Sequence, residues 1–282
     1  MGKKILIVGD CHAKPFWDKT RTKTELVPWK IANARFDALG AFIVHHKPDI
    51  IIQMGDWYDF KSISSYDKGK RSNETERLEF DIEAVADALG RVEGAIRRDN
   101  ETRMRKLYKP RKIFLLGNHE NRYIRLVNDQ PMFAQEGLGD RWHLQADPAG
   151  VHKAGWEVYP FLEAVNVEGI HLKHYWTTGI MGKPISGEYP AETMLKLVKA
   201  SCIGAHSHLF SFATRANDAI GRINAMVAGC FFGFHEDYAG PANSMWWRGL
   251  VMLNNVSAGD YDLEMFGYDR IMKEFHSGEV TY

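Results

Sequence analysis

The chain has 282 residues, of which 45% are hydrophobic and 12% aromatic, so it can bury a sizeable core and is most simply one domain over residues 1–282. Lysine plus arginine and aspartate plus glutamate both number 36, so the net charge gives no sign of a nucleic-acid or membrane partner. Three scattered cysteines exclude a disulfide framework, and the first apolar run, Ile5 to Val8, is too short for a signal peptide or a membrane span. We expect a cytoplasmic protein without a membrane partner.

Short apolar runs alternate with helical patterns in the first 120 residues. KILIVGD predicts a strand, a helix follows from about Trp29 to His46, and DIIIQMGD predicts the next strand. A second helix then carries an apolar stripe with helical spacing, formed by Leu78, Ile82, Val85, Leu89, Val92 and Ile96. KIFLLGN predicts a third strand. This order indicates a parallel sheet covered by helices, with a helical and basic insertion over about 61–110.

Beyond about residue 155 the pattern changes to short strands separated by turns. The apolar segments are WEVYP, LEAVNVE, GIHLKHYW, CIGAHSH, INAMVAGC, GLVMLNNV and YDLEMF, and one helix near Ala191 to Lys199 interrupts them. A parallel half followed by a strand-rich half predicts an α/β protein in which two sheets pack face to face with helices outside.

Polar side chains gather where five of the apolar runs end. The motifs are GDCH at 9–12, GDWYD at 55–59, GNHE at 117–120, HYW at 174–176 and AHSH at 205–208. In open α/β sheets, ligands bind in the crevice beyond the carboxyl ends of the strands. We therefore expect all five motifs to face one cleft.

Two of these motifs contain pairs of metal-binding residue types spaced two apart, Asp10 with His12 and His206 with His208. In extended backbone such pairs project to the same side, so each pair can direct two ligands toward one metal. Cys11 would then point to the opposite side, and a small buried side chain is the favoured interpretation over a metal ligand. Nitrogen and oxygen ligands without a thiolate suit Mn, Fe or Zn and argue against a structural zinc site.

Asp56 follows a buried apolar run and has no basic neighbour in the sequence. Its two carboxylate oxygens can bridge two cations, which in hydrolytic sites lie about 3.5 to 4 Å apart. Asn118 can add a neutral amide oxygen to one metal, and His119 is then free to act on the substrate. Such a pocket keeps a net positive charge and should attract a phosphate ester.

The five motifs in this order resemble the calcineurin-like metallophosphoesterase superfamily, whose pattern is DxH, GDxxD, GNHE, H and GHxH, over residues 10–208. The resemblance implies a four-layer αββα sandwich of two mixed sheets flanked by helices, with a binuclear metal site. One metal would be bound by Asp10, His12, Asp56 and His208, and the other by Asp56, Asn118, His174 and His206. His119 would contact the phosphoryl group and help protonate the leaving oxygen.

The sequence departs from the family pattern at several positions. Ala205 replaces the usual glycine of GHxH, and Tyr175 follows His174 where glycine is common, so the fine geometry there stays open. His171 is an alternative ligand to His174, which we prefer because it ends the predicted strand. GDWYDF lacks the arginine and glycine of the Ser/Thr protein phosphatase branch, and Leu116 replaces the arginine before its GNHE, so membership of that branch is not expected.

The resulting hypothesis is hydrolysis by a hydroxide that bridges two divalent metal ions, with His119 assisting the leaving group. Mn is the preferred metal, with Fe or Zn as alternatives. Asp59 and Glu120 would orient ligand imidazoles through their other ring nitrogen, or else they only cap strand ends and form turns.

Residues adjoining the motifs are candidate substrate contacts: Trp57, Tyr58, Trp176, Lys183 and Arg122. The aromatic rings can stack on bases, although packing is the favoured interpretation of each. Residues 97–112 hold eight basic and two acidic residues, and residues 14–23 carry a second basic excess. If both line the cleft they would track a phosphate backbone, whereas the alternative is a solvated surface.

Three functions stay open. The preferred one is a phosphodiesterase acting on DNA, RNA or a nucleotide. The alternatives are a phosphomonoesterase of a small metabolite or nucleotide, and an inactive relative that only binds a partner. The oligomeric state is not predicted.

Overall fold

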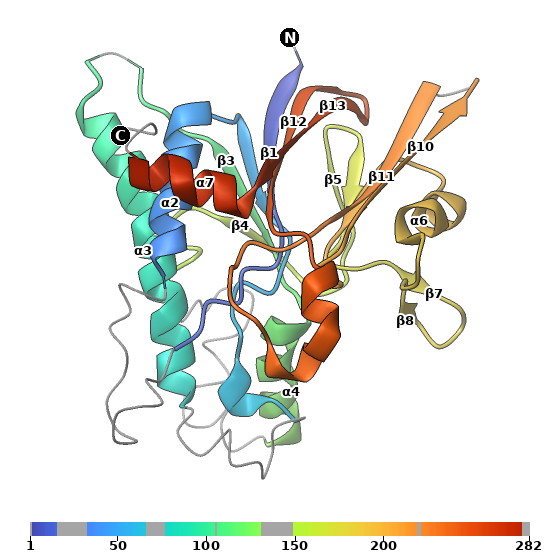
Figure 1. The fold of residues 1–282 in the computed structure, drawn as a ribbon, viewed down its shortest axis with the longest axis horizontal. Helices are drawn as coiled ribbons and strands as arrows, with labels where there is room; N and C mark the ends of the chain where they lie inside the picture. Colours follow the sequence, from blue (N-terminus) through green and yellow to red (C-terminus); the bar gives the residue numbers. More distant parts are fainter. Residues whose placement is uncertain are drawn as a thin grey trace.

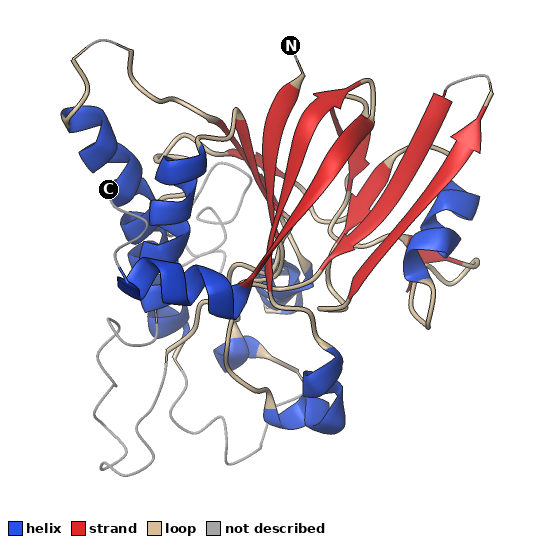
Figure 2. Cartoon of the chain, turned by 45° about the horizontal axis from the view of Figure 1, so that its top comes forward, coloured by secondary structure: helices blue, strands red, loops and turns tan. Residues whose placement is uncertain are grey.

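The computed structural model describes residues 2–15, 33–65, 77–104, 106–130, 149–218 and 221–277. Two mixed β-sheets lie face to face in its centre, with helices on both outer faces (Figures 1 and 2). Within these residues, the first sheet has six strands in the order β13-β12-β1-β2-β3-β4, and the second has five in the order β10-β11-β9-β6-β5. A small separate sheet pairs β7 with β8. This is the four-layer αββα arrangement predicted from the sequence.

The first sheet consists of β1 (Lys3–Val8), β2 (Ile50–Gln53), β3 (Arg111–Leu115), β4 (Glu157–Tyr159), β12 (Gly249–Ser257) and β13 (Asp260–Gly267). The second consists of β5 (Val165–Val167), β6 (Ile170–Leu172), β9 (Cys202–Gly204), β10 (Phe210–Asn217) and β11 (Gly221–Ala228), and the small pair of β7 (Thr177–Thr178) and β8 (Lys183–Pro184). The helices are α2 (Ala34–His46), α3 (Leu78–Glu101), α4 (Asn118–Asp129), α6 (Pro190–Val198) and α7 (Tyr268–Ser277), with the 3-10 helices η1 (Lys61–Ile63) and η3 (Asp237–Met245). None of these helices combines the length and the apolar character that a membrane span requires.

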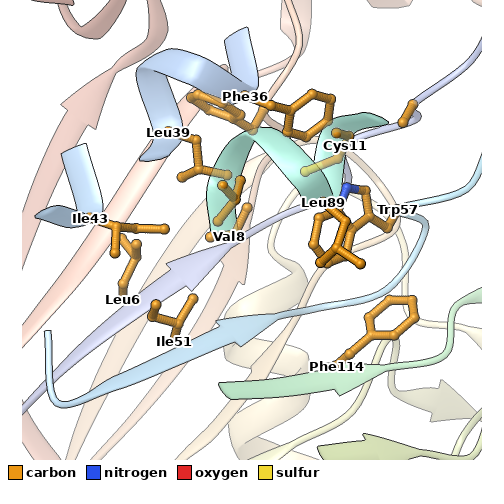
Figure 3. Packing of buried hydrophobic residues seen from close by; sticks show 14 of the residues in the cluster. Leu6, Val8, Cys11, Phe36, Leu39, Ile43, Ile51, Trp57, Leu89 and Phe114 are labelled. Carbon is orange, nitrogen blue, oxygen red and sulfur yellow. The ribbon is translucent and has the colours of Figure 1, made fainter. Parts of the chain in front are cut away.

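The outer face of the first sheet is covered by α2, α3 and α7 (Figure 1). The predicted stripe of α3 accounts for this packing, since Val85, Leu89 and Val92 are buried against the sheet side chains Leu6 and Val8. Figure 3 shows this core at close range. Complete burial of one such aliphatic side chain contributes about 1.5 to 3 kcal/mol to folding. The expected start of α2 near Trp29 lies outside the described residues.

A second core lies between the two sheets. The strand β1 alternates, so that Leu6 and Val8 face the helices while Ile5 and Ile7 face the second sheet. There they join Ile203 and other apolar side chains of the second sheet. A third core joins the second sheet to α6, which completes the four layers.

The C-terminal strands correct one expectation of the sequence analysis. The strand-rich second half does not form a sheet of its own, because β12 pairs antiparallel with β1 and β13 pairs with β12. The strand β4 also joins the first sheet, parallel to β3. The first sheet is therefore built from both ends of the chain.

The described basic residues within 97–112 lie away from the five motifs, and Arg105 lies outside the described residues. They connect the end of α3 to the beginning of β3, whereas the GNHE motif follows the carboxyl end of that strand. Several of them are paired with carboxylates, as in Arg103 with Asp99 and Lys112 with Glu93. This segment does not line the cleft, and the interpretation as a solvated surface holds for it. The second basic stretch lies outside the described residues from 16 to 23.

The two sheets are also joined at the edge far from the motifs. The turn between β5 and β6 meets the turn between β12 and β13, where the Gly259 N–H donates to the Glu168 carbonyl at 2.8 Å. A Cβ atom on Gly169 would lie 2.4 Å from the backbone nitrogen of Gly259. Glycine is thus required at this close approach of the two turns.

Candidate metal centre

The structure brings the predicted ligands together at the carboxyl edge of the two sheets. Three groups of candidate ligand atoms, each within 4.8 Å of one another, lie among the described residues: Asp10, His12 and His208; His12, Asp56 and His119; and Asp56, His174 and His206. Asp56 and His12 each belong to two groups, so the groups form one continuous cluster. Asn118 joins it through its Oδ1 atom, 2.9 Å from His174 Nε2.

The backbone that presents these ligands is not extended, as the sequence analysis assumed. The strand β1 ends at Val8 and β9 at Gly204, before the ligand pairs. The φ angle is positive at four of the seven predicted ligands: 45° at His12, 53° at Asp56, 71° at His206 and 60° at His208. Each such conformation is strained for a residue with a side chain and persists only where neighbouring contacts enforce it. The pairs converge through tight turns rather than through strand alternation.

Hydrogen bonds hold these turns in place. The Asp56 carbonyl accepts the backbone N–H groups of Cys11 and His12 at 3.0 and 2.9 Å. The buried Glu120 carboxylate accepts the N–H groups of Asp56, Tyr58 and Gly117 at 2.9, 2.9 and 2.7 Å. Glu120 therefore braces the main chain around the motifs and does not orient an imidazole, in contrast to one of its two expected roles. Burial and the nearby Asp56 carboxylate raise its pKa to about 7.

The first ligand group has its lone pairs directed inward. Asp59 Oδ1 lies 3.1 Å from His12 Nδ1, which leaves the His12 Nε2 lone pair facing His208 Nε2 at 3.2 Å. Among the described residues, the buried Asp10 Oδ2 makes no hydrogen bond of good geometry, although His208 Nε2 lies 3.0 Å away. Asp59 thus has the contact that was expected for orienting a ligand imidazole. A buried, unpartnered carboxylate oxygen among imidazole nitrogens fits a bound cation.

The second ligand group is arranged in the same way. His174 Nδ1 lies 2.8 Å from the Met54 carbonyl, so Nε2 is directed at Asp56 Oδ2, 3.4 Å away. Burial would lower the pKa of His174, but the carboxylates of Asp56 and Asp10 raise it to about 10. The cluster therefore favours a positive charge at this point. His171, the alternative ligand, lies on β6 beside Asn166 and belongs to none of the three groups.

The remaining protonation states suit divalent cations. Burial and the neighbouring His119 lower the pKa of His12 to about 4, and burial and His174 lower that of His206 to about 4. Burial opposes ionisation of Asp56, yet the surrounding imidazoles hold its pKa well below the ordinary value. Ionised carboxylates, neutral imidazoles and an amide oxygen are ligands suited to divalent Mn, Fe or Zn.

His119 lies at the start of α4 and faces the cluster. Its Nδ1 is 2.6 Å from the Asp59 carbonyl, and its Nε2 is 3.0 Å from Arg122 Nη2 and 3.9 Å from Asp56 Oδ2. A guanidinium can only donate, so Nε2 accepts in this arrangement and Nδ1 carries the proton. Burial lowers the pKa of His119, but the carboxylates of Asp56 and Asp59 outweigh it and the net pKa is raised. The ring lies between carboxylates that favour its protonation and an arginine that favours its neutral form.

Several predicted substrate contacts lie elsewhere. Trp57 and Tyr58 are 1% exposed and belong to the helix-side core, where Figure 3 shows Trp57 near Cys11. Their burial excludes stacking on a substrate base and supports the packing interpretation, as it does for Cys11. Trp176 packs beside the core under α6 and donates to the Ile203 carbonyl at 3.0 Å. Lys183 is exposed on β8.

The two departures from the family pattern have different consequences. Ala205 is buried between the sheets, and its N–H donates to the His174 carbonyl at 2.8 Å. Tyr175 places its ring 4.7 Å from that of His206, at the side of the cluster. A bulky aromatic residue therefore adjoins two predicted ligands, since its ring also lies 5.6 Å from that of His174.

One wall of the site, in the segment that follows β11, was not predicted from the sequence. Phe232 makes edge contacts with His12 and His208 at 5.4 and 5.3 Å between ring centroids, and Trp246 contacts His208 at 4.5 Å. Glu236, in the same segment, forms an ion pair with Lys14. The signal was present, because GCFFGFHED follows an apolar run as the five motifs do, and β11 runs parallel to β9.

Comparison with known proteins identifies the family. The family model for calcineurin-like phosphoesterases matches residues 3–209. No curated protein matches the chain. One crystal structure is 11% identical over 95% of this chain and 100% of its own, with a TM-score of 0.39. The family match spans all five motifs, and the clustered aspartates and histidines fit its metal-dependent chemistry. The chain belongs to the calcineurin-like phosphoesterase family.

Proposed function

We propose that this protein is a binuclear metal-dependent phosphodiesterase. The observation that carries the proposal is the overlap of three ligand groups through His12 and Asp56, with the buried Asp10 Oδ2 making no hydrogen bond of good geometry among the described residues. One metal would be held by Asp10, His12, Asp56 and His208, and the other by Asp56, Asn118, His174 and His206. Mn²⁺ is the proposed ion, with Fe or Zn as alternatives, because the ligands are nitrogen and oxygen.

The chain's own residues would position the ester and handle a proton. Bound divalent ions would lower the pKa of water and neutralise charge on the phosphoryl oxygens. His119 is proposed to assist the leaving oxygen, because its Nε2 faces the cluster while its Nδ1 is fixed by the Asp59 carbonyl. The protonated ring would donate its Nε2–H to that oxygen in place of accepting from Arg122. Phe232 and Trp246 would exclude water from the side of His208.

The charge around the cluster favours a diester over a monoester. Lys14 is paired with Glu236, and Asp59 adds a negative charge beside His12 and His119. Arg122, whose Nη2 lies 3.0 Å from His119 Nε2, is a nearby cation with no carboxylate within 4 Å among the described residues. A phosphodiester carries one negative charge and a monoester up to two. The single positive charge of Arg122, which no described carboxylate pairs with, therefore suits a phosphodiester better.

The alcohol part of the ester is proposed to be a nucleotide or nucleic acid. Tyr238, on η3 in the wall segment, is 75% exposed and lies two residues beyond Glu236. It offers an accessible ring for base stacking near the cluster, which Trp57 and Tyr58 do not. The three cysteines are free and buried, which supports a reducing compartment as part of the same proposal.

Metal analysis combined with two model esters tests this function. The protein should bind about two Mn²⁺ per chain, and it should hydrolyse bis-p-nitrophenyl phosphate faster than p-nitrophenyl phosphate. Asp56→Asn should lose both metal and activity. Preference for the monoester would favour the phosphomonoesterase alternative, and full metal occupancy without hydrolysis of either ester would contradict an enzymatic role. Single-stranded DNA, duplex DNA, RNA and cyclic nucleotides can then be compared side by side.

A further inference from the structure

Arg122 lies one helical turn after His119 on α4 and shares its face of the helix. Its Nη1 donates to the Asp59 carbonyl at 2.8 Å and to the Phe60 carbonyl at 3.4 Å, and its Nη2 donates to His119 Nε2 at 3.0 Å. Main-chain carbonyls therefore fix the guanidinium beside the catalytic candidate. Arg125, on the same helix, is exposed.

The charge of Arg122 is not neutralised locally. Within the residues that the structure describes, no carboxylate oxygen lies within 4 Å of its guanidinium, and its partners are two carbonyls and one imidazole. Arg111 and Arg222 differ in this respect, since Arg111 is paired with Glu157 and Arg222 with Asp260. A half-buried guanidinium that is held by neutral groups keeps its full attraction for an anion.

The unused donors of Arg122 have a defined geometry. A guanidinium has five N–H groups, and the three contacts leave the Nε–H and one Nη2–H. In Arg111 the Nε and Nη2 atoms together bind the Glu157 carboxylate at 2.8 and 2.7 Å, and in Arg222 they bind Asp260 at 2.7 and 3.0 Å. The same pair of donors in Arg122 suits two oxygens of one phosphoryl group.

We propose that Arg122 is a phosphoryl-binding residue, which grips two non-bridging oxygens of the ester while its Nη1 stays anchored to the Asp59 carbonyl. The inference rests on the proposed function, because it concerns the substrate of that site. The phosphoryl group of the substrate would then be bound both by the metal centre and by the Arg122 guanidinium on α4. His119 and Arg122 would both contact this phosphoryl group, because they lie on the same face of α4.

Orthophosphate binding to the Mn²⁺-loaded protein tests the proposal without relying on turnover. Isothermal titration calorimetry should show phosphate binding about 10- to 100-fold weaker in Arg122→Gln than in wild type, because a charge-assisted pair of hydrogen bonds is lost. Arg122→Lys keeps the charge without the parallel donors and should bind about tenfold more weakly. The matched control Arg125→Gln removes the same charge from the exposed part of α4 and should bind phosphate as wild type does. Metal content and the unfolding temperature are measured for each variant.

Wild-type phosphate affinity in a folded, metal-loaded Arg122→Gln protein would overturn the proposal and leave Arg122 as a brace of the loop at Asp59. Equal weakening in Arg125→Gln would also overturn it, because a general charge effect would then suffice. If Arg122→Gln does not fold, Arg122→Lys decides, and unchanged affinity in that variant counts against the proposal. Failure of the proposed function is distinguishable, since wild-type protein would then bind metal and hydrolyse no ester, whatever its affinity for phosphate.

Discussion

Asp56 combines backbone strain with several contacts at one residue. Its φ of 53° turns the chain sharply, its carbonyl holds the loop at Cys11 and His12, and its Oδ1 accepts the His119 N–H at 2.8 Å. The neighbouring position 117 must be glycine, because a Cβ there would lie 2.1 Å from Asp56 Oδ1 and 2.4 Å from its backbone nitrogen. A side chain at position 117 would therefore collide with Asp56, which the metal centre needs.

Gly117→Ala should therefore displace Asp56. We expect loss of about 1 to 3 kcal/mol in the free energy of unfolding, as for overpacked sites, together with loss of bound metal. Urea unfolding and elemental analysis measure the two effects. Gly90→Ala is the control, because a Cβ there meets nothing within 4 Å and alanine favours a helix by about 1 kcal/mol. A metal-loaded Gly117→Ala protein of wild-type stability would contradict the steric argument.

His119→Ala should separate metal binding from turnover. His119 is held by the Asp59 carbonyl and contacts the cluster without being needed in either proposed ligand set. General acid assistance contributes about 10²- to 10⁴-fold, so kcat should fall by that range while metal content stays unchanged. His171→Ala, on β6 beside Asn166, should have wild-type kcat. Wild-type hydrolysis of both an activated and a natural ester by His119→Ala would show that the role is wrong.

At the scale of elements, the apolar runs predicted the central strands well, because a buried strand needs only continuous or alternating apolar residues. The helix α4 was missed, although Glu120 lies three residues after the N-cap Gly117 and its carboxylate accepts the Gly117 N–H, which is a helix-start signal. The left-handed turns at His12 and His208 were not predictable from local sequence. Long-range hydrogen bonds such as His12 N–H to the Asp56 carbonyl enforce them.

The C-terminal end of α2 supplies a pH-dependent contribution to stability. The ring of His46 lies 4.1 Å from Phe42 and 4.9 Å from Phe266, and burial together with the charge of Lys4 lowers its pKa from 6.5 to about 4. Because the folded state disfavours protonation, this contribution is complete above about pH 6.5 and is lost as the pH falls toward about 4.

His46→Phe should therefore flatten the dependence of stability on pH between about 6.5 and 4. Denaturant unfolding of metal-free protein at several pH values measures the slope. His276→Gln removes an exposed imidazole on α7 and should keep the wild-type slope. An unchanged slope in His46→Phe would assign the pH dependence to other groups.

At the scale of the whole molecule, the metal centre depends on residues that carry none of its ligands. All seven predicted ligands precede residue 209, yet β12 borders β1 in the first sheet and β11 lies between β9 and β10 in the second. The sequence order suggested a parallel sheet followed by a separate one. It failed there because strand pairing between the two chain ends is a long-range choice that local patterns do not encode.

A chain that ends at residue 209 should consequently fail to fold. It would leave the edge of β1 without its partner strand β12, and Ile5 and Ile7 would lose their apolar neighbours Leu253 and Val251. Circular dichroism should show no cooperative thermal transition, and elemental analysis should show no stoichiometric metal, in contrast to the full chain. A cooperatively folding, metal-binding fragment would show that the C-terminal strands are dispensable.

The contact between the turns at Gly169 and Gly259 has a mechanical consequence. It fixes the two sheets to each other at one edge of the sandwich. At the opposite edge the proposed ions would cross-link the sheets, because their ligands are His174, His206 and His208 of the second sheet and Asp10 and Asp56 of the first. Removal of the ions by a chelator should then let the two sheets separate at the edge with the metal centre, while the edge at Gly169 and Gly259 stays closed. Hydrogen exchange after EDTA treatment should accelerate at residues 203–208 far more than at 167–170, and uniform acceleration would contradict this.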